Sequence, residues 1–373
     1  MKDKVLFITT KNLDYIRNVQ EIRILQERYP ECTVIGSYSS NYFWRLLTVY
    51  VRLLFHRISQ YDLIWVGFAP QLVFPLFWRF RKKKIVVDFF ISLYDTLCYD
   101  RKKVKPNGLL GKMLHTLDKK TLEGAEYVIC DTHAHEQYFR EEFDAVDKQY
   151  FTLYLEADTS LFYPRKTERP EWLKDKIIIL YFGSILPLQG VEVVLETVEL
   201  LKKVKELHFF IIGPMNKRMR KLRPEAENIA YLDWLSAEEL ADYIGMSDIC
   251  LAGHFSDEIE KASRTIPGKA YIFQAMDKKI ILGDNGANRE VFHENEKVAL
   301  VRMGDAKALA ATIMKLAEEW RRNEKNIKKM DGTVSGVYSC RRHDYLYAGS
   351  RPGGNYHFKD GHGKGENGGK KRT

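Results

Sequence analysis

The middle of the chain contains a strand, a glycine turn and a helix start in direct succession. The apolar run 177–182 ends at Gly183-Ser184, and after a short loop that includes Gly190 a helical pattern begins at Val191. Free backbone N–H groups and the helix dipole at such a turn both favour a bound anion, above all a phosphate. We therefore expect this turn to surround an anionic ligand; the alternative is that Gly183 serves only as a tight connection between strand and helix.

Polar side chains follow a strand in the first half as well. The apolar run around Val86-Val87 leads into Asp88, Ser92 and Asp95. Groups just beyond the carboxyl end of a parallel strand face the ligand crevice. Asp95 is the candidate for contacting a substrate hydroxyl or accepting its proton; its alternative is a helix N-cap or loop carboxylate. The histidines that follow the next strand lack companions at metal-ligand spacing, so we expect no metal site.

Short apolar runs alternate with helical patterns along most of the chain. Strands are predicted at 4–9, 32–36, 62–67, 84–89, 126–130, 176–182, 207–213, 228–232, 247–252, 279–282 and 298–301. Helices are predicted at 12–29, 108–123, 191–204, 237–245, 268–276 and 305–330. Such alternation predicts parallel sheets with right-handed crossovers, an α/β fold. Because the series restarts near Lys174, we expect two doubly wound, Rossmann-like domains, 1–165 and 172–330, that face a central cleft.

The last segment, 331–373, differs in composition from everything before it. Ten of the chain's 24 glycines lie there, and neither helical nor strand periodicity survives. A glycine density of this kind resists packing. The segment is either a natural flexible tail or the product of a frameshift that replaced a C-terminal helix, and we favour the frameshift.

Composition narrows the class of protein. The 373 residues are 45% hydrophobic and 29% charged, as in a globular protein, and no apolar run is long enough to span a bilayer. Five scattered cysteines without a CxxC pair favour a reducing cytoplasm, and the start Met1-Lys2-Asp3-Lys4 predicts no signal peptide. The net charge of +9 suits anionic partners, but no nucleic-acid recognition module accompanies it.

A series of short motifs in the second half resembles a known family. In order they are Phe182-Gly183-Ser184, Gln189-Gly190, Phe209–Pro214, Tyr231-Leu232, Ser247–Leu251, Lys261–Tyr271, Phe273–Met276 and Gly283–Glu290. Their order and distances are similar to those of the GT-B glycosyltransferases of the retaining family 4, the glycosyl transferases group 1. The resemblance covers roughly residues 2–330. It implies a hexosyltransferase-type enzyme that transfers a sugar from a nucleoside diphosphate sugar.

The resemblance also implies which residues bind the donor. The candidate donor-binding residues are Gly183, Ser184, Gln189, Gly190, Gly213, Lys261 and Gln274, and the candidate catalytic residues are Asp95, Arg264 and Lys269. Helix N-termini together with Arg264 and Lys269 could hold the doubly anionic diphosphate without a metal or other cofactor. Stabilising the charge on the departing diphosphate would then be catalysis by preorganised electrostatics. The ordinary alternative for the cations and for Gln274 is a solvated surface, and for Lys261 we prefer that alternative.

The chain departs from the family pattern at three positions. The family has a pair of carboxylates eight residues apart that brackets the donor sugar and ribose, and here these positions are Ile266 and Gln274. A basic residue common after the glycine turn is Gln189. Gln274 can still exchange hydrogen bonds with ribose hydroxyls, and Glu258 or Glu260 could replace the carboxylate missing at Ile266.

Two basic and aromatic segments, 42–57 and 77–84, predict a membrane-facing surface. Arg45 and Arg52 are seven residues apart on one face of the first segment, among leucines and aromatics. Helices of this composition lie in the lipid interface; the alternative is a core helix with snorkelling arginines. We therefore expect a cytoplasmic protein, peripheral on the inner face of the plasma membrane, that acts on a saccharide or lipid-linked acceptor in capsule, exopolysaccharide or cell-envelope synthesis.

Two other functions compete with this interpretation. A non-catalytic relative that serves as a binding or assembly subunit is favoured by Ile266, Gln274 and the unusual tail. A dinucleotide-dependent oxidoreductase would need GxGxxG after the first strand, and the sequence Thr9-Thr10-Lys11 there contains no glycine.

Overall fold

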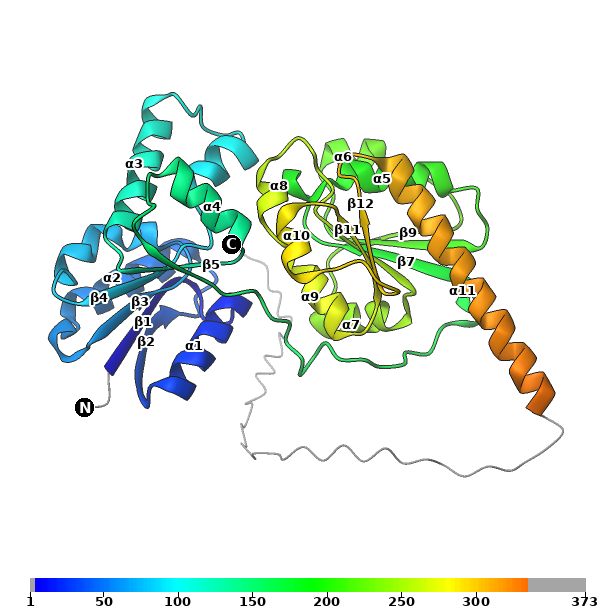
Figure 1. Ribbon diagram of the computed structural model, residues 1–373, viewed down its shortest axis with the longest axis horizontal. Coiled ribbons are helices and arrows are strands. Elements are labelled where there is room, and N and C mark those ends of the chain that lie inside the picture. The colour runs from blue at the N-terminus through cyan, green and yellow to red at the C-terminus, as the bar shows by residue number, and fades with distance from the viewer. Residues whose placement is uncertain (1–3, 335–373) are drawn as a thin grey trace, which may run out of the picture. The chain divides into compact units, whose positions relative to one another are not determined.

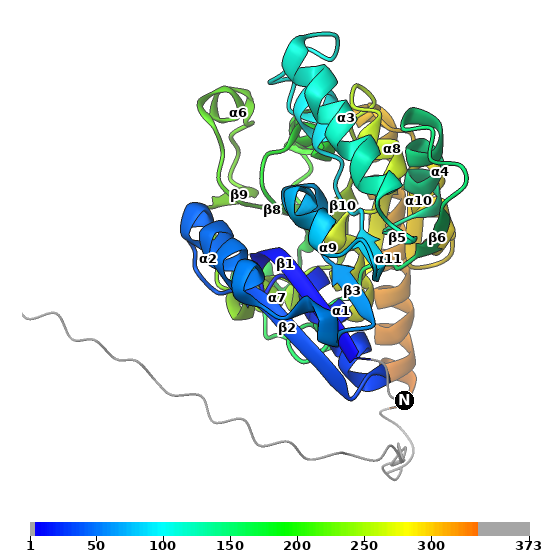
Figure 2. The ribbon, with the colours of Figure 1, turned by 90° about the vertical axis from the view of Figure 1, so that its left-hand side faces the viewer.

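The computed structural model describes residues 4–334 and contains two parallel six-stranded sheets with helices on both faces (Figures 1 and 2). Residues through Arg321 form one compact unit that includes both sheets. The predicted α/β class with two doubly wound sheets is confirmed. Among the described residues, no helix combines the length and the apolar character needed to cross a membrane.

The first sheet has the strand order β2-β1-β3-β4-β5-β6, and all its neighbouring strands are parallel. Its strands are β1 (Lys4–Asn12), β2 (Glu31–Ser37), β3 (Leu63–Val66), β4 (Lys84–Asp88), β5 (Tyr127–Cys130) and β6 (Gln149–Thr152). Its helices are α1 (Ile16–Arg28), α2 (Tyr42–Phe55), α3 (Leu109–Glu123) and α4 (His133–Glu142), with a π-helical turn η4 (Asp95–Asp100) and the short 3-10 turns η1 (Ile58–Gln60), η2 (Pro70–Leu72) and η3 (Phe74–Arg79).

Alternating residues of the first sheet point to opposite faces, as the pleat requires. Leu6 and Ile8 of β1 join a large core with α2, α3 and α4, whereas Val5 and Phe7 join a smaller core with α1. Four of the predicted strands were placed to within a residue or two, and β1 extends three residues beyond its predicted end. The strand β6 was missed because it is short and carries weak periodicity.

The second sheet has the order β12-β11-β10-β7-β8-β9, again with parallel neighbours. Its strands are β7 (Ile177–Phe182), β8 (Leu207–Ile212), β9 (Ile229–Leu232), β10 (Ile249–Gly253), β11 (Lys279–Gly283) and β12 (Val298–Val301). Its helices are α5 (Val191–Leu201), α6 (Lys217–Leu222), α7 (Ala237–Met246), α8 (Lys261–Arg264), α9 (Gly268–Ala275), α10 (Gly286–Val291) and α11 (Ala306–Val334), with the 3-10 turns η5 (Glu171–Leu173) and η6 (Pro187–Gln189).

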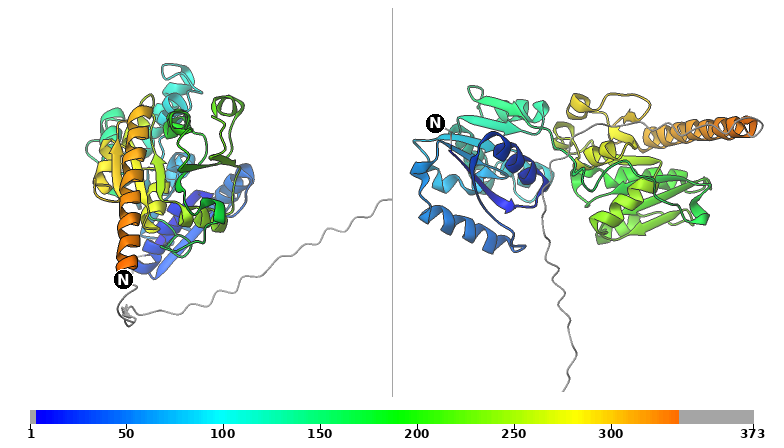
Figure 3. Two further views of the ribbon diagram at one scale, coloured as in Figure 1. Left: turned by 90° about the vertical axis from the view of Figure 1, so that its right-hand side faces the viewer. Right: turned by 90° about the horizontal axis from the view of Figure 1, so that it is seen from below.

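Helices divide between the two faces of this sheet. The helices α5, α6 and the first part of α11, the orange helix in Figure 3, share one core, and α7, α9 and α10 share the other. The predicted helix start at Val191 is confirmed, since α5 begins there. The helix α11 continues four residues past its predicted end at 330. The rest of the proposed tail, 335–373, lies outside the described residues.

Candidate functional site

The connection order of the second sheet creates a crevice between β7 and β10. The chain runs from β7 outward to β8 and β9 and then returns to the other side for β10, β11 and β12. In open parallel sheets, ligands bind outside the carboxyl ends of the strands where the direction reverses. The loops after β7 and β10, residues 183–190 and 254–260, flank this point.

Glycine is required where the ends of β7 and β8 meet. Gly183 has φ +145° and Gly213 has φ +135°, conformations that L side chains rarely adopt. A Cβ on Gly213 would overlap the carbonyl oxygen of Gly183. The two N–H groups donate to the neighbouring strands, Gly183 to Ile212 (3.0 Å) and Gly213 to Leu232 (2.9 Å). The two turns therefore touch through bare backbone, which leaves room for a ligand to approach the main chain.

Gly190 begins α5 in the left-handed conformation, with φ +64° and no side-chain cap. A Cβ there would overlap the backbone nitrogen of Ser256 in the loop after β10. Gly190 therefore allows the two loops of the crevice to pack together, and it leaves the first amides of α5 without a side-chain partner. Ser184, in the same loop, is exposed.

Lys269 lies in the first turn of α9 and reaches under the glycine turn. Its Nζ donates to the carbonyl oxygen of Phe182 (2.8 Å), lies 3.9 Å from the ring centroid of Tyr181, and lies 3.2 Å from where a Cβ on Gly183 would be. The residue is 6% exposed, and burial lowers the pKa of its ammonium well below the ordinary value. Among the described residues, no carboxylate forms an ion pair with Lys269. A buried ammonium without a carboxylate favours an anionic ligand.

Several buried polar atoms of the predicted site residues and of Tyr181 also lack a hydrogen-bond partner within the described part of the chain. They are Tyr181 Oη, Gln189 Oε1, Arg264 Nε and Asp95 Oδ2. Buried polar groups are nearly always paired in folded proteins. Two of these atoms belong to β7 and the loop after it, and the other two belong to η4 and α8, so each could accept or donate a hydrogen bond to a polar ligand.

Arg264 and Lys261 of α8 meet Asp95 of η4, so the structure brings three of the predicted site residues together. Arg264 Nη2 lies 3.0 Å from Asp95 Oδ1, and Lys261 Nζ lies 3.7 Å from Asp95 Oδ2. Lys261 also donates to Thr96 Oγ1 (2.8 Å). Asp95 is fully buried and Lys261 is 7% exposed. The expectation that Lys261 is a solvated surface residue is therefore wrong, because it is buried against η4.

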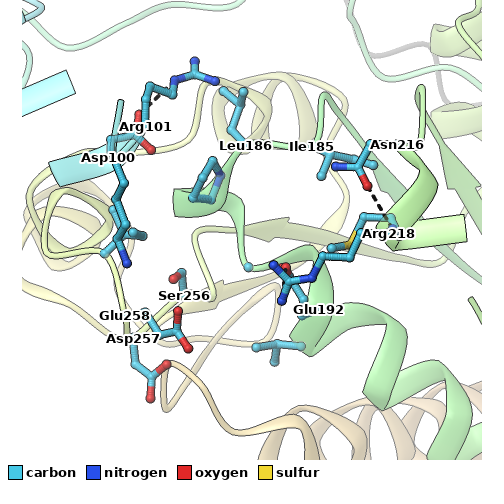
Figure 4. Close-up of a pocket in the computed structure, with 16 residues that line it drawn as sticks. Asp100, Arg101, Ile185, Leu186, Glu192, Asn216, Arg218, Ser256, Asp257 and Glu258 are labelled. Carbon is cyan, nitrogen blue, oxygen red and sulfur yellow. Dashed lines mark hydrogen bonds and ion pairs between the residues drawn. The ribbon is translucent and has the colours of Figure 1, made fainter. Parts of the chain in front are cut away.

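A pocket of about 330 Å³ lies beside this cluster (Figure 4). Its walls come from η4 and the residues after it, the loop before α5, the start of α6 and the loop after β10. The lining residues are Asp100, Arg101, Lys102, Ile185, Leu186, Pro187, Gly190, Glu192, Val193, Asn216, Arg218, Met219, Ser256, Asp257, Glu258 and Ile259. Carboxylates and cations both line it, and burial raises the pKa of Asp100. This mixture can exchange hydrogen bonds with a polyhydroxylated ligand.

The remaining predicted residues lie in different environments. Ile266 packs in the core of the second sheet. Gln274 is exposed near the end of α9, more than one turn from Lys269. Of the two substitute carboxylates, Glu258 lines the pocket, whereas Glu260 is exposed and pairs with Arg264 (3.3 Å).

Sequence reasoning missed a carboxylate that joins the two halves. Both oxygens of Glu290 in α10 accept backbone N–H groups at the start of α4, from His133 and from Ala134 (2.8 Å each), and Tyr154 Oη donates to the same carboxylate (2.9 Å). The helix α4 lies beside α8 and α10 in Figures 1 and 2. The only signal in the sequence was the placement of Glu290 at the end of a family motif.

A second missed group is the buried pair His135 and Asp131 after β5, in which His135 Nδ1 lies 2.7 Å from Asp131 Oδ1. Within the described residues, no group of three or more His, Cys, Asp or Glu side chains is placed to hold a metal ion. The pair therefore supports the start of α4, where Thr132 provides the N-cap.

The predicted membrane-facing segments contain both core and exposed residues. In α2, Val49 and Leu53 are buried, while Phe43, Trp44 and Phe55 are exposed. Arg45 is buried and donates to the carbonyl oxygens of Thr10 (2.9 Å) and Ser39 (2.8 Å), so it does not share an outer face with Arg52. In the second segment, Phe77 and Phe80 are buried and Trp78 is exposed.

Known structures share this fold. Sucrose-phosphate synthase from Thermosynechococcus elongatus superposes with a TM-score of 0.60 at 14% identity, covering 84% of this chain and 90% of that chain. HepE from Anabaena, solved in complex with UDP, superposes with a TM-score of 0.58 at 13% identity, covering 90% of this chain and 100% of that chain. A glycosyltransferase from Rickettsia africae superposes with a TM-score of 0.55 at 16% identity, covering 85% of this chain and 89% of that chain. Identities this low show a common fold, and the fold is that of the GT-B glycosyltransferases.

The sequence of the second sheet is similar to that of one family. Residues 176–319 match the profile of the family described as glycosyl transferases group 1, and this segment contains the glycine turn, α8 and α9. The second half of the chain is therefore similar to the glycosyl transferases group 1. A search of curated protein sequences gave no match.

Proposed function

We propose that the protein transfers a sugar, with retention of configuration, from a nucleoside diphosphate sugar to a saccharide or lipid-linked acceptor in the synthesis of capsule, exopolysaccharide or cell-envelope glycan. The observation that carries the donor class is Lys269, a buried ammonium without a carboxylate, held at the glycine turn of β7. An anion in the crevice would supply the missing charge. HepE, which has this fold, was solved with UDP, with UDP and glucose and with UDP-glucose.

In this proposal the diphosphate lies over Gly183, Ser184 and Gly190, with Lys269 beneath it and Arg264 at its side. Preorganised cations stabilise the charge that develops on the departing diphosphate, and this requires no metal. Gln189 has an unpartnered buried oxygen that can accept a hydrogen bond from the ligand. Gly213 keeps the neighbouring turn open for the nucleoside, and Lys261 adds charge from α8.

The acceptor is assigned to the pocket between η4 and the loops of the second sheet. Its carboxylates, Asp100, Asp257 and Glu258, suit the hydroxyl groups of a saccharide. Asp95 Oδ2 has no hydrogen-bond partner, and it is the atom that we assign to the acceptor hydroxyl. Because Asp95 is fully buried, that contact requires η4 and α8 to move apart.

Binding and turnover test the donor and the reaction separately. UDP, UDP-glucose and GDP-mannose are titrated into the full-length protein by isothermal calorimetry, and each nucleotide sugar is then incubated with candidate acceptors while release of the nucleoside diphosphate is followed. The proposal requires binding of at least one nucleotide that is weakened in Arg264→Met and Lys269→Met, and an α-configured product from an α-configured donor. Absence of binding for every nucleotide, or inversion at the anomeric carbon, contradicts it.

A non-catalytic binding or assembly subunit is the second candidate. It is favoured by Ile266, which is part of the core, and by Gln274, which is exposed, because neither supplies a carboxylate to the donor. Nucleotide binding without transfer or hydrolysis of any donor would support this candidate, and turnover with one donor would exclude it.

Peripheral attachment to the inner face of the plasma membrane is proposed for the exposed face of α2. Phe43, Trp44, Leu47 and Val51 are all at least 41% exposed on it. Aromatic and aliphatic side chains of this kind enter the lipid interface. Cosedimentation with vesicles containing anionic lipid should fall in Trp44→Ser/Leu47→Ser relative to the parent protein, and equal cosedimentation would remove the proposal.

A further inference from the structure

Arg264 belongs to the second half of the chain, but residues of the first half hold it. Its Nη2 pairs with Asp95 (3.0 Å), its guanidinium carbon lies 3.9 Å from the ring centroid of Tyr138, and its carbonyl oxygen accepts the hydroxyl of Thr132 (2.5 Å). Only Glu260, 3.3 Å from Nη1, lies on the same helix segment. The orientation of this cation is therefore set mainly by residues of the first half of the chain.

The Tyr138 ring is itself fixed before it meets Arg264. It packs against Phe139 and Phe143 of the first core, with ring centroids 5.7 Å and 6.2 Å away, and stacks beside His135. Its helix, α4, is held at its N-terminus by the carboxylate of Glu290. Burial raises the pKa of the Tyr138 phenol, so the ring remains neutral at physiological pH. A rigid neutral ring is a suitable platform for a guanidinium plane.

One edge of the guanidinium remains without a partner. Nη2 is occupied by Asp95 and Nη1 by Glu260, whereas Nε is buried and has no hydrogen-bond partner among the described residues. A change in the orientation of the guanidinium group would redirect this N–H group. The Tyr138 ring, whose centroid lies 3.9 Å from the guanidinium carbon, covers one side of the group and opposes that movement.

We infer that Tyr138 is a positioning residue for the donor diphosphate. It acts through Arg264, holding the guanidinium so that its unpartnered N–H is presented to a phosphate oxygen. Donor affinity is consequently set in part by the half of the protein that does not carry the donor-binding turn. The inference rests on the proposed function, because it requires Arg264 to meet the diphosphate.

The test compares Tyr138→Leu with a control at Tyr150 of β6, a tyrosine that contacts the same helix, α4. Tyr150 faces Arg140 of α4 at 4.2 Å and, like Tyr138, has a buried hydroxyl without a hydrogen-bond partner and a raised pKa. Tyr150→Leu therefore removes the same kind of contact without touching Arg264. The affinity for UDP and for inorganic pyrophosphate is measured by calorimetry for the parent, for both leucine variants, for Tyr138→Phe, for Arg264→Met and for the double variant Tyr138→Leu/Arg264→Met.

We expect Tyr138→Leu to bind UDP about tenfold more weakly, as loss of a largely desolvated cation–π contact implies. Tyr138→Phe and Tyr150→Leu should remain within about twofold of the parent, and the double variant should be no weaker than Arg264→Met. If Tyr138→Leu does not fold, Tyr138→Met keeps the volume while removing the ring face, and the same expectation applies to it.

The outcomes separate this inference from the proposed function. If Arg264→Met binds UDP as tightly as the parent, the assignment of Arg264 to the diphosphate fails, and with it the premise. If Arg264→Met is weakened while Tyr138→Leu matches the parent, only the inference is overturned. Additive losses in the double variant also overturn it, because Tyr138 would then act by a route other than Arg264.

Discussion

Lys269 should lower the stability of the ligand-free protein and raise its affinity for a nucleotide. The substitution Lys269→Met separates the two effects. Methionine keeps most of the length of the side chain and removes the charge. In the free protein the ammonium is buried with one carbonyl and one aromatic ring as partners. Desolvating an ion costs several kcal/mol, which these two contacts offset only in part. We expect the variant to be more stable by about 1 kcal/mol, visible as a rise of about 2 °C in melting temperature.

The effect on binding should have the opposite sign. A unit charge pair about 4 Å apart at an effective dielectric constant near 20 is worth about 4 kcal/mol. Removing one partner of a buried charge pair commonly weakens binding by about 2–5 kcal/mol. At about 1.4 kcal/mol per tenfold change, the affinity of Lys269→Met for UDP should fall at least about thirtyfold.

The same reasoning gives a pH dependence. Burial depresses the pKa of Lys269 in the free protein, and a bound diphosphate should raise it again. As pH rises through the depressed pKa, the free protein loses the charge, so UDP affinity should fall and binding should be accompanied by proton uptake. In Lys269→Met this part of the pH dependence should be absent. Calorimetry in two buffers of different ionisation enthalpy measures the uptake.

Lys278→Met is the matched control for this experiment. Burial also lowers the pKa of Lys278, which precedes β11 and therefore lies at the opposite end of the sheet. Its Nζ donates to the carbonyl oxygens of Gly245 (2.6 Å) and Ser247 (3.0 Å). Its substitution should leave UDP affinity unchanged. A Lys269→Met protein that melts lower than the parent and binds UDP within about threefold of it would refute the reasoning and make Lys269 a structural residue.

Three further substitutions have expected outcomes. Glu290→Ala removes the carboxylate at the N-terminus of α4 and should lower stability by about 1–2 kcal/mol, with faster amide exchange confined to that helix end; unchanged exchange would contradict the capping role. Gly213→Ala places a methyl group against the carbonyl oxygen of Gly183 at φ +135° and should weaken UDP binding more than tenfold in calorimetry, with parent-like affinity as the contrary result. Glu21 accepts a hydrogen bond from Trp65 Nε1 (2.8 Å) and has a pKa raised by burial, so its contribution to stability is present at low pH and is lost as pH rises through that pKa. Glu21→Gln should remove this loss when urea unfolding is compared at pH 6 and pH 9. Identical pH profiles of the variant and the parent would contradict the prediction.

The sequence predicted the features that depend on neighbouring residues. The apolar run before Gly183, the glycine itself and the helical period from Val191 are local signals, and β7 and α5 lie where they indicated. The alternation of strands and helices predicted both sheets for the same reason. The strand β6 was missed because four residues, Gln149–Thr152, are too few to establish a period.

Contacts between the halves could not be predicted in this way. Arg264 and Asp95 are 169 residues apart in sequence, and Glu290 and His133 are 157 apart. Each is an ordinary charged or polar residue on a short element, and neither its type nor its spacing identifies its partner. Tyr138 carried no signal either, because an aromatic residue in an amphipathic helix is usually a core residue. The burial of Lys261 was missed because its partners, Asp95 and Thr96, lie far from it in sequence.

The absence of a basic residue at Gln189 can be explained by the positions of the cations on α8 and α9. Gln189 leaves the loop after the glycine turn without the basic residue that the family has there, but α8 and α9 place Lys261, Arg264 and Lys269 close to η4 and to the turn. Cations in the loop would belong to the second sheet alone. Cations on α8 contact Asp95 of the first half, and so their position depends on contacts made by both halves. If these cations hold the donor, then its binding is coupled to the approach of η4 and α4, which a basic residue at Gln189 would not achieve.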